Sequence, residues 1–245
     1  VGIIVTLLTE TITFFTRVPI TEFLFSKDWN PFSSTPQYGI WALILGTLKI
    51  TAIATIVAVP LGLGAALYLS EYASTRVRKI IKPILEILSG IPTIVFGFFA
   101  LTFVTPVLRS IFPELGSFNS ISPGIVVGVM IIPLISSMSE DAMSSVPNKI
   151  REGALGLGAT KFEVATKVIL PAATSGIMAS IVLAISRAIG ETMIVSLAAG
   201  STPSSSLDLT GSIQTMTGYI VQVATGDATF GSDIYYSCLL YTSLS

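Results

Sequence analysis

The sequence predicts an all-α, polytopic membrane protein, on the strength of two bulk properties and the length of its apolar runs. Of its 245 residues, 51% are hydrophobic and only 11% are charged. An average soluble domain has about 25% charged residues, because they cover its solvated surface. The mean hydropathy is +0.83, so the surplus apolar surface must face a lipid bilayer. Several runs approach the roughly 20 apolar residues that one membrane-spanning helix needs.

The remaining composition argues against several kinds of site. The formal net charge is −1 and the sequence has no histidine, so neither a basic nucleic-acid surface nor a histidine metal site is expected. The single cysteine, Cys238, excludes an internal disulfide and a cysteine-rich zinc site. We therefore expect no metal, no cofactor and no nucleic-acid partner.

The apolar runs define the expected helices in chain order. Residues 1–15 are interpreted as the end of a helix that starts before the printed sequence. Four further spans are expected, at Trp41–Leu69, Ile84–Val107, Pro123–Met138 and Ala172–Ala199. An external loop over 200–233 should contain a short helix at Ile213–Ala224, and a last span should begin near Ile234. Residues 237–245 are expected to be a truncated or non-native end, so the complete protein should have six spans, with the first and last truncated here.

Basic residues predict the orientation of these spans. They are concentrated in two connections, residues 70–83 and 139–171, each with four lysines or arginines. Because Lys and Arg are enriched in cytoplasmic loops, both connections are predicted to be cytoplasmic. Residues 201–233 contain aspartates but no Lys or Arg, which favours the outer side. Residues 1–245 are interpreted as one transmembrane domain.

Polar and helix-breaking residues inside the runs need their own explanation. Lys49 lies near one end of its span, where its ammonium group can snorkel to the membrane interface. Pro92 lacks a backbone donor and is expected to break its helix just after Ser89 and Gly90. Gly62 and Gly64 resemble part of a dinucleotide-binding turn, but inside a span tight helix packing is the better explanation.

The connection at 139–171 has the pattern of two short helices. Ile150, Ala154 and Leu157 are spaced to lie on one helical face. Gly158 then interrupts the pattern, and a second apolar stripe leads to Pro171. Such a helix pair, with charges beside apolar residues, suits a groove on a partner protein. The alternative is a segment that lies on the bilayer surface.

This connection resembles the EAA signature of ABC importer permeases, which in that family docks on the ATP-binding subunit. The signature departs at two positions, where Gly153 replaces an alanine and Val168 replaces an isoleucine. The residues that match it, and to which the resemblance assigns ATPase coupling, are Glu152, Gly153, Ala154, Gly158, Leu170 and Pro171.

No nucleotide-binding loop accompanies this signature. Gly158 is followed by Ala159 and Thr160 rather than by the lysine and hydroxyl residue of a P-loop. ATP hydrolysis is therefore expected on a partner subunit, and the chain is expected to be a transporter permease rather than an enzyme.

Two ionisable residues interrupt the span at 172–199. Arg187 and Glu191 are spaced i, i+4, which would place them on one helical face. An ionisable group in mid-membrane costs about 3 kcal/mol, so each needs a function. Either they form a neutralised pair that fixes helix packing, or they line a pathway in which the arginine attracts an anion. Their spacing leaves both interpretations open.

Residues 186–193 resemble the RAxGET segment of phosphate importer permeases, where this arginine and glutamate are implicated in transport. Further similarity lies at residues 22–31, 60–72 and 89–97, and the long outer segment Asp28–Tyr38 resembles the PstC type rather than its PstA-type partner. The resemblance covers about residues 1–236.

This resemblance implies a MetI-like permease of a bacterial or archaeal plasma (inner) membrane that forms a phosphate pathway and works by alternating access. The implied partners are a homologous PstA-type permease subunit, two ATP-binding subunits, a periplasmic phosphate-binding protein, phosphate and the lipid bilayer. A permease for another oxyanion, such as sulfate or molybdate, is the alternative. An intramembrane enzyme or a passive channel is the third hypothesis.

Overall fold

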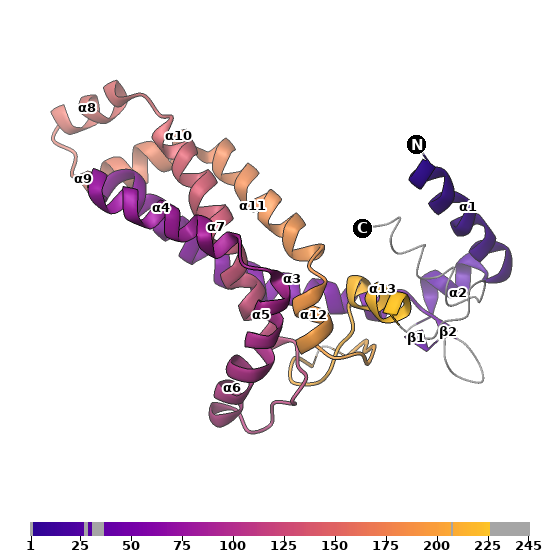
Figure 1. The fold of residues 1–245 in the computed structure, drawn as a ribbon. Coiled ribbons are helices and arrows are strands. Elements are labelled where there is room, and N and C mark those ends of the chain that lie inside the picture. Colours follow the sequence, from indigo (N-terminus) through magenta and orange to yellow (C-terminus); the bar gives the residue numbers. More distant parts are fainter. Residues whose placement is uncertain (1, 27–28, 31–36, 207, 226–245) are drawn as a thin grey trace. The chain divides into compact units, whose positions relative to one another are not determined.

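The computed structural model describes residues 2–26, 29–30, 37–206 and 208–225, and nearly all of its secondary structure is helical (Figure 1). The all-α class is therefore confirmed. The chain forms two compact units. Unit 1 contains residues 1–52, 93–127 and 189–245, and unit 2 contains residues 53–92 and 128–188. The interpretation of the chain as one domain stays a prediction.

Unit 1 combines short helices with one small sheet. Its elements before the first long helix are α1 (Gly2–Arg17), α2 (Ile20–Phe25), β1 (Trp29–Asn30) and β2 (Gln37–Tyr38). The two strands pair antiparallel. The unit continues with the first turns of α3 (Trp41–Leu67), α5 (Thr93–Phe99), the π-helical turn η2 (Ala100–Val104), α6 (Thr105–Ile111), the first turns of α7 (Ile121–Ser144), α12 (Met193–Ala198) and α13 (Met216–Thr225).

Aromatic rings form much of the core of unit 1. Phe14 is fully buried, and its ring meets those of Phe23 and Tyr38 in T-shaped contacts at centroid distances of 5.9 and 5.8 Å. Trp29 meets Tyr219 in the same geometry at 5.1 Å. This arrangement is favourable because the positive edge of one ring faces the negative face of the other. It packs α1, α2, the strand pair and α13 around one cluster.

Unit 2 consists of longer helices and the connection that carries the EAA-like signature. It contains the remainder of α3, the π-helical turn η1 (Tyr68–Tyr72), α4 (Thr75–Ser89) and most of α7. The chain then forms α8 (Asn148–Gly156), α9 (Lys161–Glu163), the π-helical turn η3 (Val164–Ile169), α10 (Leu170–Ala172) and α11 (Thr174–Ile189).

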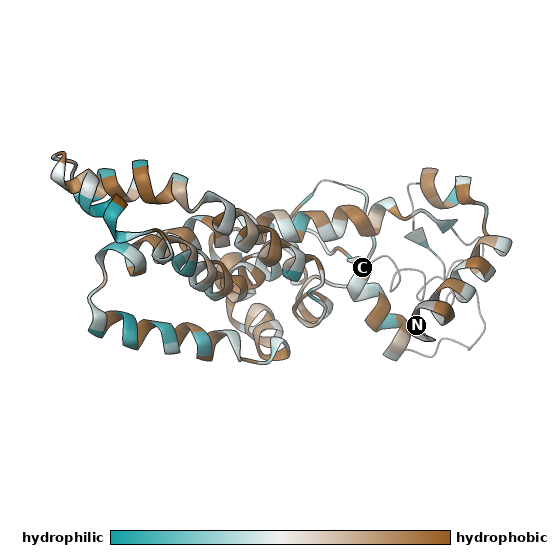
Figure 2. Ribbon diagram, turned by 90° about the horizontal axis from the view of Figure 1, so that it is seen from above, coloured by the Kyte–Doolittle hydropathy of each residue, from teal (hydrophilic) through white to brown (hydrophobic). Residues whose placement is uncertain are grey.

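Three helices in the described part of the chain are long and apolar enough to cross a membrane. They are Trp41–Tyr72, Thr93–Ile111 and Ile121–Ser144. A fourth candidate is the pair Lys161–Ala172 and Thr174–Ile189, which is bent by 71°. Figure 2 shows hydrophobic residues along the helical ribbon. The span expected from Ile234 and the anomalous end at 237–245 lie outside the described residues.

Two predicted spans are interrupted. The run Ile84–Val107 is not one helix, because α4 ends at Ser89 and α5 begins at Thr93. This confirms the expected break at Pro92, and it moves the span to Thr93–Ile111. The run Ala172–Ala199 is likewise divided, since α11 ends at Ile189 and α12 begins only at Met193.

Other predicted boundaries shift by a few residues. The predicted cytoplasmic connection at 139–171 begins too early, because α7 continues to Ser144. The short helix expected at Ile213–Ala224 is present as α13, from Met216 to Thr225. The basic connection at 70–83 is helical over most of its length, as η1 and α4.

Close packing of α3 against α7 depends on Gly62. A Cβ atom at this position would lie 2.8 Å from Cγ2 and 2.9 Å from Cβ of Ile135, a side chain that is fully buried. Gly64, in the same helix, has no atom within 4 Å of the corresponding point. Gly62 therefore serves helix packing, as predicted, whereas the same prediction is wrong for Gly64, which has open space beside it.

We expect Gly62→Val to lower the stability of the detergent-solubilised protein by about 1–3 kcal/mol, because overpacking displaces the two helices. Gly64→Val is the matched control and should leave thermal unfolding nearly unchanged. Thermal unfolding followed by circular dichroism measures both. An equal loss in the two variants would contradict the packing role of Gly62.

Candidate functional site

The connection between α7 and α11 contains two short helices joined by a glycine turn, as predicted. Gly158 has φ +90°, a left-handed conformation that glycine adopts without steric cost. Thr160 and Glu163 then form a capping box at the start of α9. The Glu163 backbone N–H donates to Thr160 Oγ1 at 3.3 Å, and the Thr160 backbone N–H donates to Glu163 Oε2 at 3.0 Å. Local geometry therefore fixes the turn.

Most of the residues predicted for coupling lie at the surface of unit 2. Glu152, Gly153, Gly158 and Pro171 are exposed, and Ala154 and Leu170 are partly buried. Apolar side chains near them are exposed as well, namely Ile150, Leu155, Leu157 and Phe162. Exposed apolar residues gathered in this way mark a contact with a protein or a membrane.

The predicted common face of Ile150, Ala154 and Leu157 is wrong in part. Ala154 packs against the buried cluster of unit 2, whereas Ile150 is 45% exposed and Leu157 is 91% exposed. The reason is that α8 ends at Gly156, so Leu157 no longer follows the helical repeat. The buried cluster includes Met143, Val146, Val164, Ile169 and Ile177, and it anchors the connection to α7 and α11.

A charged cluster lies between α4 and α7. The Glu140 side chain is 1% exposed, forms an ion pair with Lys82, and has Oε1 3.6 Å from Nη1 of Arg78. Ser144 Oγ donates to Glu140 Oε1 at 3.0 Å. Lys82 Nζ also lies 3.3 Å from Asp141 Oδ1. The hydrogen bond to Glu140 raises the pKa of Lys82 above its ordinary value, so Lys82 is charged at neutral pH.

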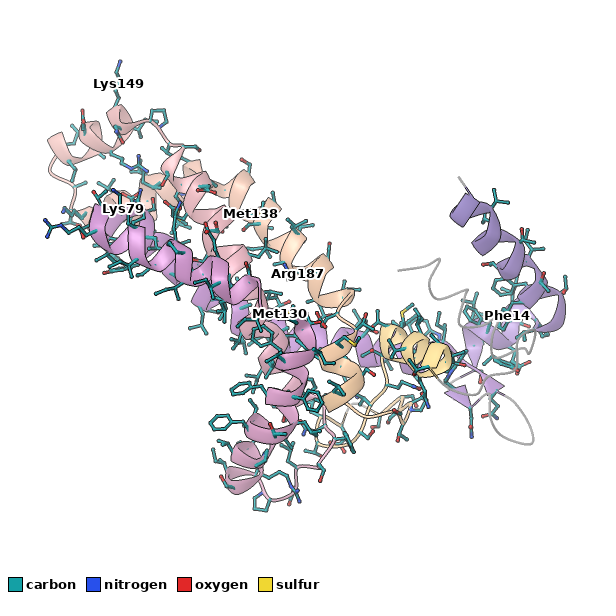
Figure 3. The ribbon with its side chains drawn as sticks, viewed as in Figure 1. Phe14, Lys79, Met130, Met138, Lys149 and Arg187 are labelled. Carbon is teal, nitrogen blue, oxygen red and sulfur yellow. The ribbon has the colours of Figure 1, made fainter. Side chains whose placement is uncertain are left out.

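We expect Lys82→Gln to destabilise the protein by about 1–3 kcal/mol, because it removes a partner of a buried carboxylate. Lys79→Gln, an exposed position of α4 labelled in Figure 3, is the control and should have little effect. Since the pKa of Lys82 is raised above 10.5, its stabilisation is present at neutral pH and is lost as the pH rises through the raised value.

Thermal unfolding at neutral pH checks this effect, and the double variant Lys82→Met/Glu140→Leu should recover part of the loss, since it removes both charges. Equal stability of Lys82→Gln and Lys79→Gln would show that the ion pair contributes nothing.

A cavity of about 210 Å³ lies within unit 2, bordered by α4, α7 and the end of α11. Apolar side chains, including Met130 and Met138 of α7, form part of its lining (Figure 3). Its polar lining consists of Lys82, Glu86, Ser89, Ser137 and Arg187. A mostly apolar cavity with a few convergent polar groups is a typical ligand site.

Arg187 is the lining residue best suited to an anion. Its side chain is exposed, and within the described part of unit 2 no hydrogen bond or ion pair engages its guanidinium. A guanidinium presents several N–H donors in a planar fork that matches carboxylate and phosphate oxygens. The cavity therefore combines an unpaired cation with the hydroxyl groups of Ser89 and Ser137.

The prediction that Arg187 and Glu191 share one helical face is wrong. The helix of Arg187 ends at Ile189, so Glu191 lies beyond it. Glu191 is 7% exposed, and its Oε1 accepts hydrogen bonds from the backbone N–H groups of Met193 at 3.1 Å and Ile194 at 3.3 Å. Its carboxylate thus satisfies free donors at the start of α12, which accounts for a buried charge at this point.

The prediction that Lys49 reaches the membrane interface stays a prediction, but its ammonium group is bound within the protein. Lys49 is 8% exposed, and its Nζ donates to the backbone carbonyl oxygens of Ser206 and Asp208, the latter at 3.0 Å. These carbonyls belong to the loop after α12, more than 150 residues away. No local sequence signal indicates such a contact.

From the sequence, Arg151 is only one of the basic residues of its connection, and Glu71 has no predicted function. In the structure, Arg151 donates to Glu71, which lies 80 residues earlier. The only available signal was that Arg151 directly precedes the EAA-like signature at Glu152.

Comparisons with known proteins agree with this architecture. The family described as "Binding-protein-dependent transport system inner membrane component" matches residues 58–242. The chain is 39% identical to the probable ABC transporter permease protein YqgH of Bacillus subtilis, over 86% of this chain and 68% of that protein. It is 34% identical to the phosphate transport system permease protein PstC of Mesorhizobium japonicum, over 91% of this chain and 72% of that protein.

A solved structure supports the fold. One structure of the MetNI methionine ABC transporter in an inward-facing conformation superposes with a TM-score of 0.59 and 19% identity, covering 84% of this chain and 90% of that one. The predicted MetI-like permease fold is therefore confirmed.

The fold, the exposed EAA-like segment and these relatives define the class, a multi-pass permease subunit of an ABC transporter. The chain belongs to the inner-membrane components of binding-protein-dependent transport systems. Proteins of this family act with an ATPase and a substrate-binding protein, so ATP hydrolysis resides on a separate subunit.

Proposed function

We propose that this chain is the PstC-type permease subunit of an ATP-driven phosphate importer and forms part of its translocation pathway. The observation that carries the proposal is the unpaired guanidinium of Arg187 in the cavity of unit 2. Relatives named as PstC support it, at 34% identity in Mesorhizobium japonicum and 32% in Xylella fastidiosa.

The chemistry of the cavity suits a small tetrahedral oxyanion. Phosphate has several acceptor oxygens, and hydrogen bonds from a charged donor to such oxygens are about twice as strong as neutral ones. Arg187 supplies the charged donors, and Ser89 and Ser137 supply hydroxyls. A volume of about 210 Å³ is well above the roughly 10–15 Å³ that one water requires, which leaves room for the anion with some of its hydration shell.

The same cavity limits how tightly an anion binds. Lys82 is in its lining but is already paired with Glu140, so it adds little free charge. Glu86 also lines the cavity and repels an anion. A transport site must release what it binds, so binding of moderate strength favours passage.

Coupling to ATP hydrolysis is assigned to the exposed segment around α8. Its matching residues are Glu152, Gly153, Ala154, Gly158, Leu170 and Pro171. Beside them, Leu157 and Phe162 are the exposed apolar side chains that would enter a groove on the ATPase. Closure of the ATPase subunits would move α8, and the spans would then alternate between outward and inward access.

The proposed complex contains a homologous PstA-type permease subunit, two ATP-binding subunits and a periplasmic phosphate-binding protein. In this proposal Glu191 belongs to the pathway residues with Arg187, because it holds the start of α12 immediately after the helix that carries Arg187. Sulfate or molybdate would meet the same donors, so an anion-competition assay decides between these substrates.

We expect Arg187→Gln to reduce phosphate uptake about tenfold or more, because the loss of a charged hydrogen bond costs about 1.5–3 kcal/mol. Uptake is measured in cells that lack their own phosphate permeases and express the complete gene with its partners. Arg76→Gln, which removes an exposed charge of α4, is the control and should retain uptake.

Unchanged uptake in Arg187→Gln, with normal assembly of the complex, would remove Arg187 from the pathway. Uptake of labelled sulfate or molybdate without uptake of labelled phosphate would contradict the phosphate assignment.

We expect Gly158→Val to abolish transport while the subunit still inserts and assembles. Valine at φ +90° is strained by about 1–3 kcal/mol, so the turn between α8 and α9 must change direction. Gly156→Val adds the same side chain, also into open space, at a residue without positive φ, and it should retain most uptake. The two variants are compared by uptake and by co-purification of the ATPase, and equal uptake would refute the role of the turn.

A further inference from the structure

Arg151 lies on α8, the helix that the proposed function assigns to the ATPase, yet its side chain contacts other elements of unit 2. Its Nη2 donates to the backbone oxygen of Met143 and its Nη1 to that of Val146, both at 2.7 Å. Met143 lies in the last turn of α7, and Val146 lies two residues beyond the end of that helix at Ser144. A cation is also favourable at this negative end of the helix dipole.

The same guanidinium forms an ion pair with Glu71. Nε and Nη2 of Arg151 donate to Glu71 Oε1 at 3.3 and 3.1 Å, and Ser70 Oγ donates to the same oxygen at 2.8 Å. The side chains of Arg151 and Glu71 are only 17% and 11% exposed, so solvent and salt screen this pair less than a surface pair. Glu71 belongs to η1, the turn that ends the long helix beginning at Trp41.

The end of that helix is held from a second side by Arg78. Arg78 Nη2 donates to the backbone oxygens of Leu69 at 2.6 Å and Ser70 at 3.1 Å. The segment Leu69–Glu71 is therefore bound by one arginine from α4 and by another from α8. Neither link is an apolar contact, along which helices can slide.

We infer that Arg151 is a positioning residue that makes α8 move together with the ends of α7 and of the α3–η1 helix. This inference rests on the proposed function, because it requires a partner ATPase that moves α8. The planar guanidinium fork donates in several directions at once, which a lysine ammonium on a flexible chain does not reproduce. One side chain thus joins the coupling helix to two spans.

Lys149, two residues earlier on α8, provides a matched comparison. Its side chain extends away from the helix in Figure 3 and is exposed. Among the described residues it forms no hydrogen bond or ion pair. The two cations share one helix, but only Arg151 connects it to the spans.

The first test measures phosphate uptake and ATP hydrolysis together, in proteoliposomes that contain the complete transporter. Arg151→Ala should continue to hydrolyse ATP, while the phosphate transported per ATP falls about tenfold, a typical size for coupling between sites. Arg151→Lys should fall between Arg151→Ala and the unaltered complex, and Lys149→Ala should keep the unaltered ratio. The ratio of phosphate to ATP does not depend on the amount of complex, so a variant that only impairs assembly leaves it unchanged. An unchanged ratio in Arg151→Ala would therefore overturn the inference.

Glu71→Gln tests the ion pair. It also tests the positioning role of Arg151 if the Arg151→Ala complex fails to assemble. Its ratio of phosphate to ATP should fall, and the double variant with Arg151→Ala should lose little more than Arg151→Ala alone, because the two residues act through one contact. An unchanged ratio in Glu71→Gln would overturn the inference.

A second test needs no substrate, so it separates this inference from the phosphate assignment. Spin labels at Lys149 and Tyr72, both exposed, are placed in a chain whose Cys238 is replaced by serine, and this chain is assembled with partner subunits that have no reactive cysteine. The distance between the labels should stay constant when ATP is added to this complex and should change in the Arg151→Ala variant. Equal changes of this distance in the unaltered complex and in the Arg151→Ala variant would overturn the inference. An unaltered complex that fails to take up phosphate contradicts only the proposed substrate.

Discussion

The structure depends on one constraint, that a buried charge in or beside an apolar helix must find its partner within the protein. Hydrocarbon offers no hydrogen bonds, and an unsatisfied group there costs several kcal/mol. Within unit 1, Lys49 meets this constraint through loop carbonyls, and Glu191 meets it through the first donors of α12. Within unit 2, Glu140 meets it through Lys82 and Ser144. Arg187 differs from these residues because its guanidinium is unpaired within unit 2.

The sequence predicted the features that depend on residues close to one another along the chain. Composition and apolar runs predicted the helical membrane class, Pro92 predicted the break after α4, and Gly158 predicted the turn of the coupling segment. The errors concern distant contacts. Periodicity could not show that a break separates Arg187 from Glu191, because the backbone oxygen freed there accepts from Thr217 Oγ1, a residue 26 positions later.

The contacts of Lys49 and Arg151 show why the rest could not be predicted. Their partners are more than 150 and 80 residues away, and no spacing rule connects such positions. For Lys49 the sequence indicated only a cation near the end of a span, which snorkelling explains equally well. For Arg151 it indicated only a positive charge on the predicted cytoplasmic side. Lys49 binds backbone oxygens, which every residue type presents alike, and the distant partner of Arg151 is the carboxylate of Glu71.

The bend of 71° between Lys161–Ala172 and Thr174–Ile189 has a mechanical consequence. Ala173 at the corner is buried, and its backbone N–H donates to Ile169 while its carbonyl accepts from Ile177, so hydrogen bonds continue through the corner and stiffen it. A movement of Lys161–Ala172 would therefore be transmitted through the corner to Thr174–Ile189, the helix that carries Arg187, and the bend would change its direction.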